Sequence, residues 1–283
     1  MSTTNTMNAF VLRTIVRNLD VQDWEGVEKD VQPSIDLNGQ TQPATVFFDQ
    51  LSKPPAGPEV WWERQTDVIA LDSGGDAVAA RFIHRIRPRE NAQSPEEAYE
   101  FQEIVFAWFV ESRLTRWLSL RDEDGFRART PSVPRTPHQS YTDRSPPADP
   151  SLDLAEHYRA YIDSINAKTM EAEFGRFCQQ ELEHSGRRLS IAEYIPLISD
   201  SQDAIEDLHF NIRDLLADPQ TQQVAAVLEF TGTPVREWGG AKPNGKSVRF
   251  RELVMYQLHE GKIQRVWSVI ELDAYREQLK EVV

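Results

Sequence analysis

The sequence predicts an α+β protein that contains two copies of one fold. Its 283 residues fit about two domains at roughly 100 to 200 residues each. A proline-rich stretch lies near the middle of the chain, and the two flanks of this stretch repeat each other. Each flank shows helical periodicity first and strand-like segments afterwards. This order, with an antiparallel sheet formed from consecutive strands, is typical of the α+β class.

The repeat is clearest toward the end of each copy. The residues from Phe101 onward align without a gap on the residues from Phe250 onward, so that Glu103 falls on Glu252. Between the copies, residues 126–151 contain six prolines and almost no large aliphatic residue, which predicts an extended linker. The predicted organisation is therefore a disordered N-terminus over residues 1–9, a first domain over 10–125, the linker, and a second domain over 152–283.

Each copy is expected to begin with an amphipathic helix. The apolar residues of this helix recur at spacings of three and four: Val11, Ile15, Val16 and Leu19 in the first copy, and Tyr158, Tyr161, Ile162 and Ile165 in the second. Further helices are predicted over residues 25–35 and 44–51, and over 170–182 and 190–198. Strands are predicted over 59–71, 77–87, 101–110 and 113–121, and over 207–216, 224–233, 247–259 and 262–272. Three helices on a curved antiparallel sheet would close a cone with an internal cavity.

Composition excludes several classes of partner. The formal net charge of −14 repels phosphate backbones and anionic lipid headgroups, so neither nucleic acid nor a membrane surface is an expected partner. The longest apolar run has seven residues, where a membrane-spanning helix needs about 20. The first residues lack the features of a signal peptide, so we expect a cytoplasmic protein. Cys178 is the single cysteine, and neither a disulfide within the chain nor a structural metal is expected.

The second copy contains an ordered series of short motifs. They are Asp207-Leu208-His209-Phe210, Phe230-Thr231-Gly232-Thr233, Pro243-Asn244-Gly245-Lys246 and Gly261-Lys262-Ile263, followed by Trp267. This series resembles the SnoaL-like polyketide cyclases of the NTF2-like superfamily. The resemblance implies two tandem cone-shaped α+β barrels, each with a ligand pocket. It also implies cyclase, isomerase or dehydratase activity without a metal or organic cofactor, although many superfamily members have no catalytic activity.

The resemblance places the general acid/base at Glu271, where enzymatic relatives carry aspartate on the last strand. The equivalent residue of the first copy is Asp122. Alternation along the strand groups Asp122 with Leu118 and Leu120, so both acids are expected to point inward, where burial raises a carboxyl pKa. The alternative is a carboxylate at the strand end that faces water or pairs with Arg265 or Arg276.

Asp207 and His209 lie two residues apart on a predicted strand and therefore share one face. We expect His209, oriented by Asp207, to donate a proton while Glu271 removes one next to a carbonyl. The first copy has Val60, Trp61 and Trp62 at the corresponding positions, so the second copy is the expected active one. The alternative for His209 is an ordinary hydrogen-bonded histidine in the core or on the surface.

Five further residues of the second copy are predicted to bind the substrate: His184, Glu252, Trp267, Trp238 and Tyr256. Glu103 is the counterpart of Glu252 in the first copy. Alternatives exist for three of the five. His184 can be an exposed turn residue, Glu252 can pair with a cation across a hairpin, and Trp238 can belong to a plain hairpin connection.

The sequence thus predicts a cofactor-independent acid/base enzyme acting on a hydrophobic, oxygenated small molecule such as a polyketide or terpenoid intermediate. A competing hypothesis is a protein that binds a ligand or a protein partner without catalysis, including a transport-factor-like role with basic partners. For assembly, we expect a monomer whose copies pack sheet to sheet as an intramolecular pseudo-dimer. A higher homo-oligomer is the alternative.

Overall fold

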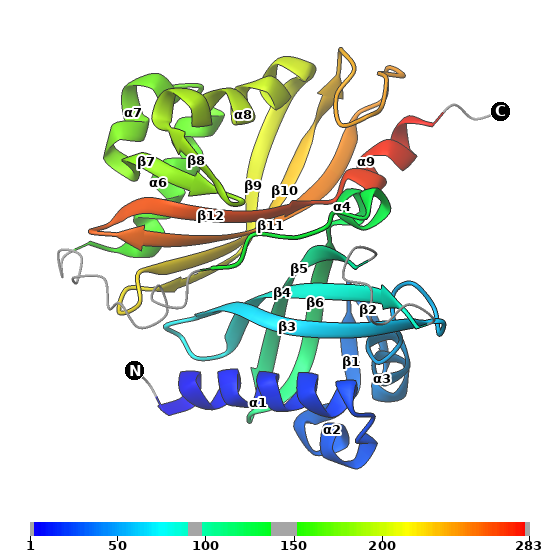
Figure 1. Ribbon diagram of the computed structural model, residues 1–283. Helices are drawn as coiled ribbons and strands as arrows, with labels where there is room; N and C mark the ends of the chain where they lie inside the picture. The colour runs from blue at the N-terminus through cyan, green and yellow to red at the C-terminus, as the bar shows by residue number, and fades with distance from the viewer. Residues whose placement is uncertain (1–2, 90–97, 137–151, 281–283) are drawn as a thin grey trace. The chain divides into compact units, whose positions relative to one another are not determined.

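The chain forms two compact units, Met1–His138 and Gln139–Val283, each with one six-stranded sheet and several helices (Figure 1). The structure, a computed structural model, describes residues 3–89, 98–136 and 152–280. The predicted α+β class with two tandem NTF2-like units is confirmed by the two sheet-and-helix units. The division between the units falls within the stretch that was predicted to be a linker.

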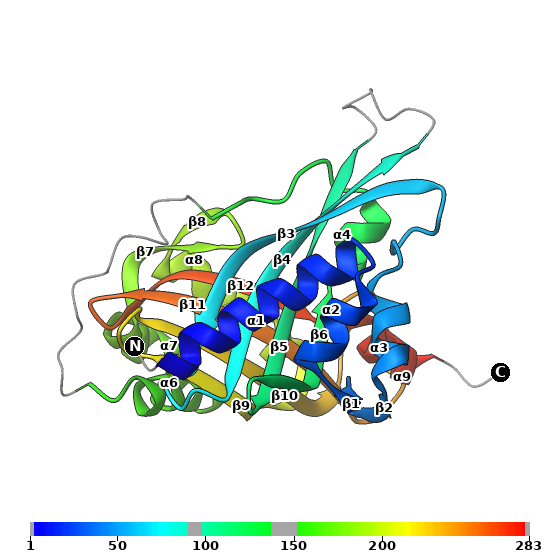
Figure 2. The same ribbon diagram turned by 90° about the horizontal axis from the view of Figure 1, so that it is seen from below.

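The first unit begins with helices and continues with strands. Its elements are α1 (Thr3–Asp20), α2 (Trp24–Asp30), β1 (Val31–Leu37), β2 (Gln40–Pro43), α3 (Ala44–Leu51), β3 (Val60–Leu71), β4 (Ala77–Pro88), β5 (Tyr99–Val110), β6 (Arg113–Arg121) and α4 (Glu123–Ala128). The helix α1 lies across the sheet and packs on β3 and β4 (Figure 2).

The second unit repeats this order. Its elements are α6 (Leu154–Asn166), α7 (Met170–Phe177), β7 (Cys178–His184), β8 (Arg187–Ser190), α8 (Ile191–Ala204), β9 (Ile205–Asp218), β10 (Gln223–Pro234), β11 (Val248–His259), β12 (Lys262–Ile270) and α9 (Leu272–Leu279). A capping box between Ser190 and Glu193 starts α8, because each side chain satisfies a backbone N–H at the first turn.

Both sheets have the same topology. The strand orders are β2-β1-β6-β5-β4-β3 and β8-β7-β12-β11-β10-β9. The pairings β1 with β6 and β7 with β12 are parallel, and all the others are antiparallel. The expected long helices and the four long strands of each copy surround a separate apolar core in each unit.

Two of the predicted helices are shorter than expected. The helix predicted over 25–35 ends at Asp30 and the helix predicted over 170–182 ends at Phe177, and each continues as a strand. These strands pair in parallel with the last long strand of their unit, a long-range contact that local periodicity does not reveal. Pro33 was a local sign against helix in the first copy, because proline lacks the N–H that a helix interior needs.

The predicted N-terminus and linker also differ from the structure. The helix α1 begins at Thr3, and the Asn8 side chain donates a hydrogen bond to the Gly75 carbonyl, so most of residues 1–9 is helical and not disordered. The part of the predicted linker up to residue 136 contacts the first sheet. Arg135 pairs with Glu100 at 2.7 Å. Residues 137–151 of that prediction lie outside the described residues.

None of the helices in the described segments combines the length and the apolar character that crossing a membrane requires.

Candidate active site

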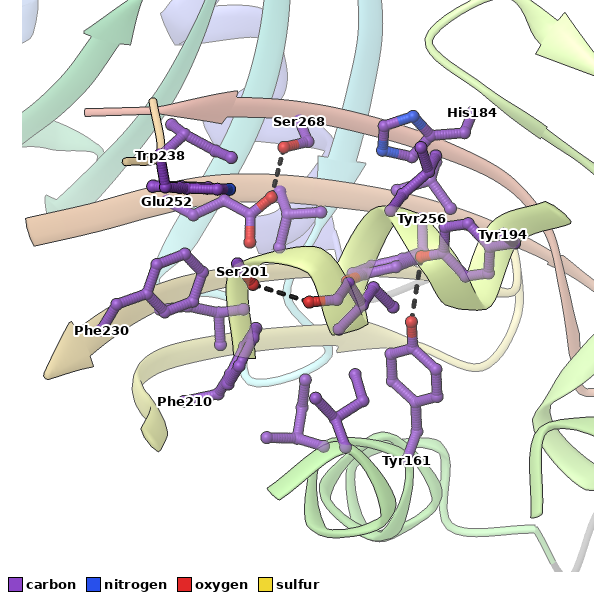
Figure 3. A pocket seen from close by; sticks show the side chains of 18 residues that line it. Tyr161, His184, Tyr194, Ser201, Phe210, Phe230, Trp238, Glu252, Tyr256 and Ser268 are labelled. Atoms are coloured by element: carbon purple, nitrogen blue, oxygen red, sulfur yellow. Dashed lines mark hydrogen bonds between the residues drawn. The ribbon is translucent and has the colours of Figure 1, made fainter. Parts of the chain in front are cut away.

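The second unit encloses a cavity of about 120 Å³ between α6, α8 and the concave face of its sheet (Figure 3). Most of the lining is apolar or aromatic, and a few polar side chains converge on the cavity. The lining residues are Tyr161, Ile162, Ile165, His184, Tyr194, Leu197, Ile198, Ser201, Phe210, Leu228, Phe230, Trp238, Glu252, Val254, Tyr256, Val266, Ser268 and Ile270. Concave apolar pockets with a few polar groups are the usual form of small-molecule sites.

Strand alternation brings Glu252 into this cavity. Glu252, Val254 and Tyr256 are two residues apart on β11 and share the face that lines the pocket, as the period of two requires. On the neighbouring strand β12, Ser268 lines the pocket. It donates a hydrogen bond to a carboxyl oxygen of Glu252.

The carboxyl group of Glu252 is unusually easy to protonate. Burial raises the pKa of Glu252 to about 7, although the hydrogen bond from Ser268 opposes part of this rise. The residue keeps some accessible surface because it faces the cavity. Protein surrounds the carboxyl group, however, so water does not stabilise its charge well. Figure 3 shows this carboxyl group pointing into the cavity. It therefore exchanges a proton in the range where a general acid or base is most effective.

His184, at the end of β7, also lines the cavity. Burial and, to a smaller extent, the nearby charge of Arg187 together lower the pKa of His184 to about 4. Its ring lies 5.7 Å from the ring of Tyr194. Near neutral pH the pocket therefore contains an uncharged imidazole, which offers one donor and one acceptor, and a carboxyl group that is about half ionised.

Several comparisons place this unit among known proteins. Residues 155–279 match the family model of the SnoaL-like polyketide cyclases. A SnoaL-like polyketide cyclase from Agrobacterium tumefaciens is 34% identical, and the match covers 46% of this chain and 99% of that one, with a TM-score of 0.43. The chain belongs to the SnoaL-like polyketide cyclase family. The family match lies entirely in the second unit, called the SnoaL-like unit below.

Two further solved structures are similar at lower identity. A protein from Acidithiobacillus ferrooxidans is 19% identical, with 46% of this chain and 96% of that chain covered and a TM-score of 0.41. AclR from Streptomyces galilaeus is 18% identical, with 46% and 100% covered and a TM-score of 0.39. A search of the curated proteins gave no match.

The predicted catalytic residue Glu271 does not line the cavity of the SnoaL-like unit. It is the residue before α9, and its carboxylate accepts hydrogen bonds from the backbone N, Nε and Nη2 of Arg251 at 3.1, 3.1 and 2.7 Å. This arrangement is the alternative of an arginine-paired carboxylate at the strand end, but the partner is Arg251 and not Arg265 or Arg276. Asp122 occupies the same position before α4, where its carboxylate caps the helix by accepting from the Gly125 backbone N–H at 2.9 Å.

The inward face of the last long strand is therefore the opposite of the predicted one. Val266, Ser268 and Ile270 of β12 line the cavity, and Trp267 lies between them on the other face. The equivalent inward residue of β6 is Trp117, whose ring packs edge to face on Phe47 at 5.4 Å. Leu118 and Leu120, on the other face from Trp117, are buried as well, so apolar character alone did not identify the inward face.

Asp207 and His209 share one face of β9, as expected, but both side chains are exposed to solvent. The alternate residues Leu208 and Phe210 point into the core. Asp207 has a positive φ of 54° at an irregularity in the pairing of β9 with β10. The structure does not bring these two residues together with Glu271 in a pocket, so the predicted catalytic trio is not assembled.

Four of the five predicted substrate-binding residues line the cavity: His184, Glu252, Trp238 and Tyr256. Trp267 is the exception. The prediction missed Tyr161 and Tyr194 as pocket residues, although Tyr161 had been assigned to the buried face of its helix. It also missed Ser268. The recurrence of this serine as Ser119 in the first copy could have identified it as a pocket residue.

The first unit carries the same glutamate in a different environment. Glu103 Oε2 lies 2.9 Å from His84 Nε2, and Trp62 Nε1 donates to His84 Nδ1 at 3.0 Å. Because indole N–H is only a donor, His84 Nδ1 must accept, and the proton on Nε2 is donated to Glu103. This pattern requires a neutral histidine and an ionised glutamate.

The electrostatics of the pair agree with this assignment. Burial lowers the pKa of His84. Burial alone would raise the pKa of Glu103, but the hydrogen bond from His84 and the charge of Arg64 outweigh this effect, so the pKa of Glu103 is lowered. The same position in the two units thus holds a carboxyl that titrates near 7 and a carboxylate that stays ionised.

The strand register also shifts the alignment of β3 with β9 by one residue relative to the sequence alignment. Phe82 lies opposite Glu103 and pairs with Thr66, as Leu228 lies opposite Glu252 and pairs with Ile212. By this register the counterparts of Phe210 and Phe230 are Arg64 and His84, and the counterpart of His209 is Glu63 rather than Trp62. The aromatic wall of the SnoaL-like pocket is replaced in the first unit by charged and polar side chains.

Within the described residues, no group of three or more histidine, cysteine, aspartate or glutamate side chains is arranged to hold a metal ion.

Proposed function

We propose that the protein is a cofactor-independent acid/base enzyme that acts on a hydrophobic, oxygenated small molecule in the SnoaL-like unit. Glu252, and not Glu271, is the proton-transfer group. The observation that supports this most is a carboxyl group with a pKa of about 7 in a cavity whose other walls are mostly aromatic and aliphatic. Perturbed carboxyl groups in a cleft are typical of active sites.

The chemistry of this proposal is proton transfer at carbon. The Glu252 carboxylate removes a proton from a carbon next to a carbonyl, and the C–H electron pair moves toward the carbonyl oxygen to form an enolate. The resulting carboxylic acid then returns a proton to the substrate at another atom. Cyclisation, isomerisation and dehydration all use this pair of steps. Ring closure of a polyketide intermediate is the version that the family description favours.

The remaining polar residues of the pocket position the substrate. Ser268 donates to Glu252, which fixes the carboxyl group and keeps its pKa from rising further. His184 is neutral and can hydrogen-bond a substrate oxygen without adding charge. Trp238, whose indole packs edge to face on Tyr275 at 5.2 Å, is held in place as part of the apolar wall.

The test is exchange of deuterium from a simple ketone. Cyclohexanone deuterated at both carbons next to the carbonyl is incubated with the protein in ordinary water, and deuterium loss is followed by mass spectrometry. The wild-type protein should accelerate the loss over buffer. Glu252→Gln should reduce the enzymatic rate at least about 100-fold, because general acid/base catalysis contributes about 10² to 10⁴.

Two variants serve as matched controls. Glu103→Gln makes the same change at the equivalent position of the first unit, and Glu271→Gln makes it at the acid that the sequence favoured. Both should retain the wild-type exchange rate once correct folding has been checked by circular dichroism. A Glu252→Gln variant as fast as the wild type would contradict the proposal. A wild-type protein that binds the ketone without exchanging its deuterium would favour a non-catalytic binding protein.

A further inference from the structure

Four buried tyrosines stand together in the SnoaL-like unit: Tyr158 and Tyr161 on α6, Tyr194 on α8 and Tyr256 on β11. Tyr158 donates a hydrogen bond to the Tyr256 hydroxyl at 3.4 Å. The hydroxyls of Tyr161 and Tyr194 are 3.0 Å apart and share a second hydrogen bond. Three of the four, all except Tyr158, line the cavity.

The hydrogen-bond count leaves two phenol protons for a ligand. Each phenol has one proton to donate, and the two bonds within the cluster use two of the four. Tyr256 accepts from Tyr158 and so keeps its own proton, as does whichever of Tyr161 and Tyr194 accepts within their pair. No acceptor for these two protons is found in the described part of the chain.

These phenols stay protonated and therefore act as donors. Burial raises the pKa of all four tyrosines. The charge of Glu252 raises the pKa of Tyr158, Tyr194 and Tyr256 further, which shows that the carboxyl group lies close enough to act on the cluster. In Figure 3 the hydroxyls of Tyr161 and Tyr194 meet on the side of the cavity nearer His184.

The pocket also selects the charge of its ligand. No lysine or arginine is found among the residues that line the cavity, and Glu252 is the one carboxyl group there. A ligand carboxylate or phosphate would lose its hydration next to the Glu252 carboxyl group, and no cation would stabilise the charge of the ligand there. A neutral ligand avoids this cost.

The cavity volume indicates the size of the ligand group that lies inside it. A buried cavity of roughly 150 Å³ holds one benzene ring, and this cavity measures about 120 Å³. The space is therefore of the order of one six-membered ring, beside an aromatic wall in which Phe210 and Phe230 pack on each other with their centroids 4.5 Å apart.

We propose that the pocket binds a neutral, single-ring ketone whose carbonyl oxygen accepts hydrogen bonds from the phenol groups of Tyr256 and of the Tyr161–Tyr194 pair. The binding geometry stands on these contacts alone, whereas the reaction that follows rests on the proposed function of Glu252. The phenols would then stabilise the negative charge that develops on the oxygen when Glu252 removes the neighbouring proton. Tyr158, which does not line the cavity, is a positioning residue that orients Tyr256.

The test follows the carbonyl group of the bound ligand. The infrared band of cyclohexanone labelled with ¹³C at the carbonyl is recorded at saturating protein, because hydrogen bonds to the oxygen lower the carbonyl stretching frequency. The wild-type band should lie below its position in an apolar solvent. Tyr256→Phe and Tyr194→Phe should each move it back toward that position and weaken binding about 2- to 10-fold, the effect of one lost hydrogen bond.

Tyr275→Phe is the matched control. The Tyr275 hydroxyl is also buried and has no hydrogen-bond partner within the described residues, but Tyr275 does not line the cavity. This variant should keep the wild-type band and affinity. Cyclohexanecarboxylate, the anionic counterpart of the probe, should bind at least 10-fold more weakly than cyclohexanone at pH 8. Phe variants with an unchanged band, or equal binding of the carboxylate, would overturn the proposal.

The two proposals fail in distinguishable ways. Deuterium exchange that depends on Glu252, together with a carbonyl band insensitive to the tyrosines, would leave the proposed function standing and reject the phenol site. A band that responds to Tyr256→Phe without any deuterium exchange would support the phenol site and reject the enzymatic role. Both proposals predict that Glu252→Gln keeps the lowered band while losing exchange.

Discussion

The raised pKa of Glu252 makes a prediction about stability that needs no substrate. The folded protein holds the Glu252 proton up to about pH 7, whereas the unfolded chain releases it near the ordinary value of 4.5. Between these values the folded state binds more protons, so stability falls as pH rises. The difference of about 2.5 units corresponds to about 3 kcal/mol, an upper value because the cavity leaves the carboxyl group some access to water.

Glu252→Gln removes this titration. The free energy of unfolding of the variant, relative to the wild type, should therefore be lowest near pH 4 and increase by up to about 3 kcal/mol by pH 8. Urea unfolding at half-unit pH steps measures this difference directly. A difference that stays constant from pH 4 to 8, or that changes in the opposite direction, would refute the reasoning.

Glu103→Gln is an internal comparison of opposite sign. The lowered pKa of Glu103 means that its ionised form stabilises the folded state above the unfolded pKa, and that this contribution disappears as pH falls through the folded pKa. The variant should therefore be less stable than the wild type at pH 7, and the deficit should shrink in acid. The two variants thus test whether one sequence position has two electrostatic environments.

Three other predictions concern the partners of Glu252 and Glu271 and the assembly of the chain. Ser268→Ala should raise the Glu252 pKa by about one to two units, because a hydrogen bond to a charged group contributes about 1.5 to 3 kcal/mol, and the pH midpoint of ketone exchange should move upward with it. Glu271→Gln should lower the free energy of unfolding by about 1 kcal/mol or less, since it weakens the partly exposed pair with Arg251, and urea unfolding measures this loss. Light scattering should give the mass of one chain if the predicted intramolecular pseudo-dimer replaces a homodimer; twice that mass would contradict it.

Much of the fold was predictable because its signals are local or repeated. The spacing of Val11, Ile15 and Leu19 identified the buried face of α1. The recurrence of one copy in the other fixed the number of units. The strands β1 and β7 were missed because their pairing depends on residues far away in the sequence, and a short segment does not show by itself whether it extends or coils.

The candidate site was only partly predictable. Glu252, His184, Trp238 and Tyr256 were expected in the pocket and line it, because alternation and recurrence locate residues in mid-strand well. Glu271 was misplaced because it follows the last residue of β12, and beyond a strand end alternation no longer directs a side chain. The pKa of Glu252 was beyond sequence analysis, since it depends on burial among residues from several elements.

The different behaviour of Glu103 and Glu252 shows why recurrence alone does not establish function. Both occupy the same position of the sheet, but Glu103 faces His84, where the SnoaL-like unit has Phe230. An imidazole N–H stabilises a carboxylate, and a phenyl ring does not. The change from phenylalanine to histidine on the adjacent strand, together with the nearby charge of Arg64, thus holds Glu103 as a hydrogen-bonded carboxylate, whereas Glu252 titrates near 7.

The most direct test of the central claim is the pKa of Glu252 itself. Difference infrared spectra between pH 4 and 9, recorded for the wild type and for Glu252→Gln, isolate the carboxyl band of this one residue. The structure predicts that the protonated carboxyl band missing from the variant disappears with a midpoint near pH 7. A midpoint near the ordinary value of 4.5 would contradict the claim that Glu252 is poised for proton transfer.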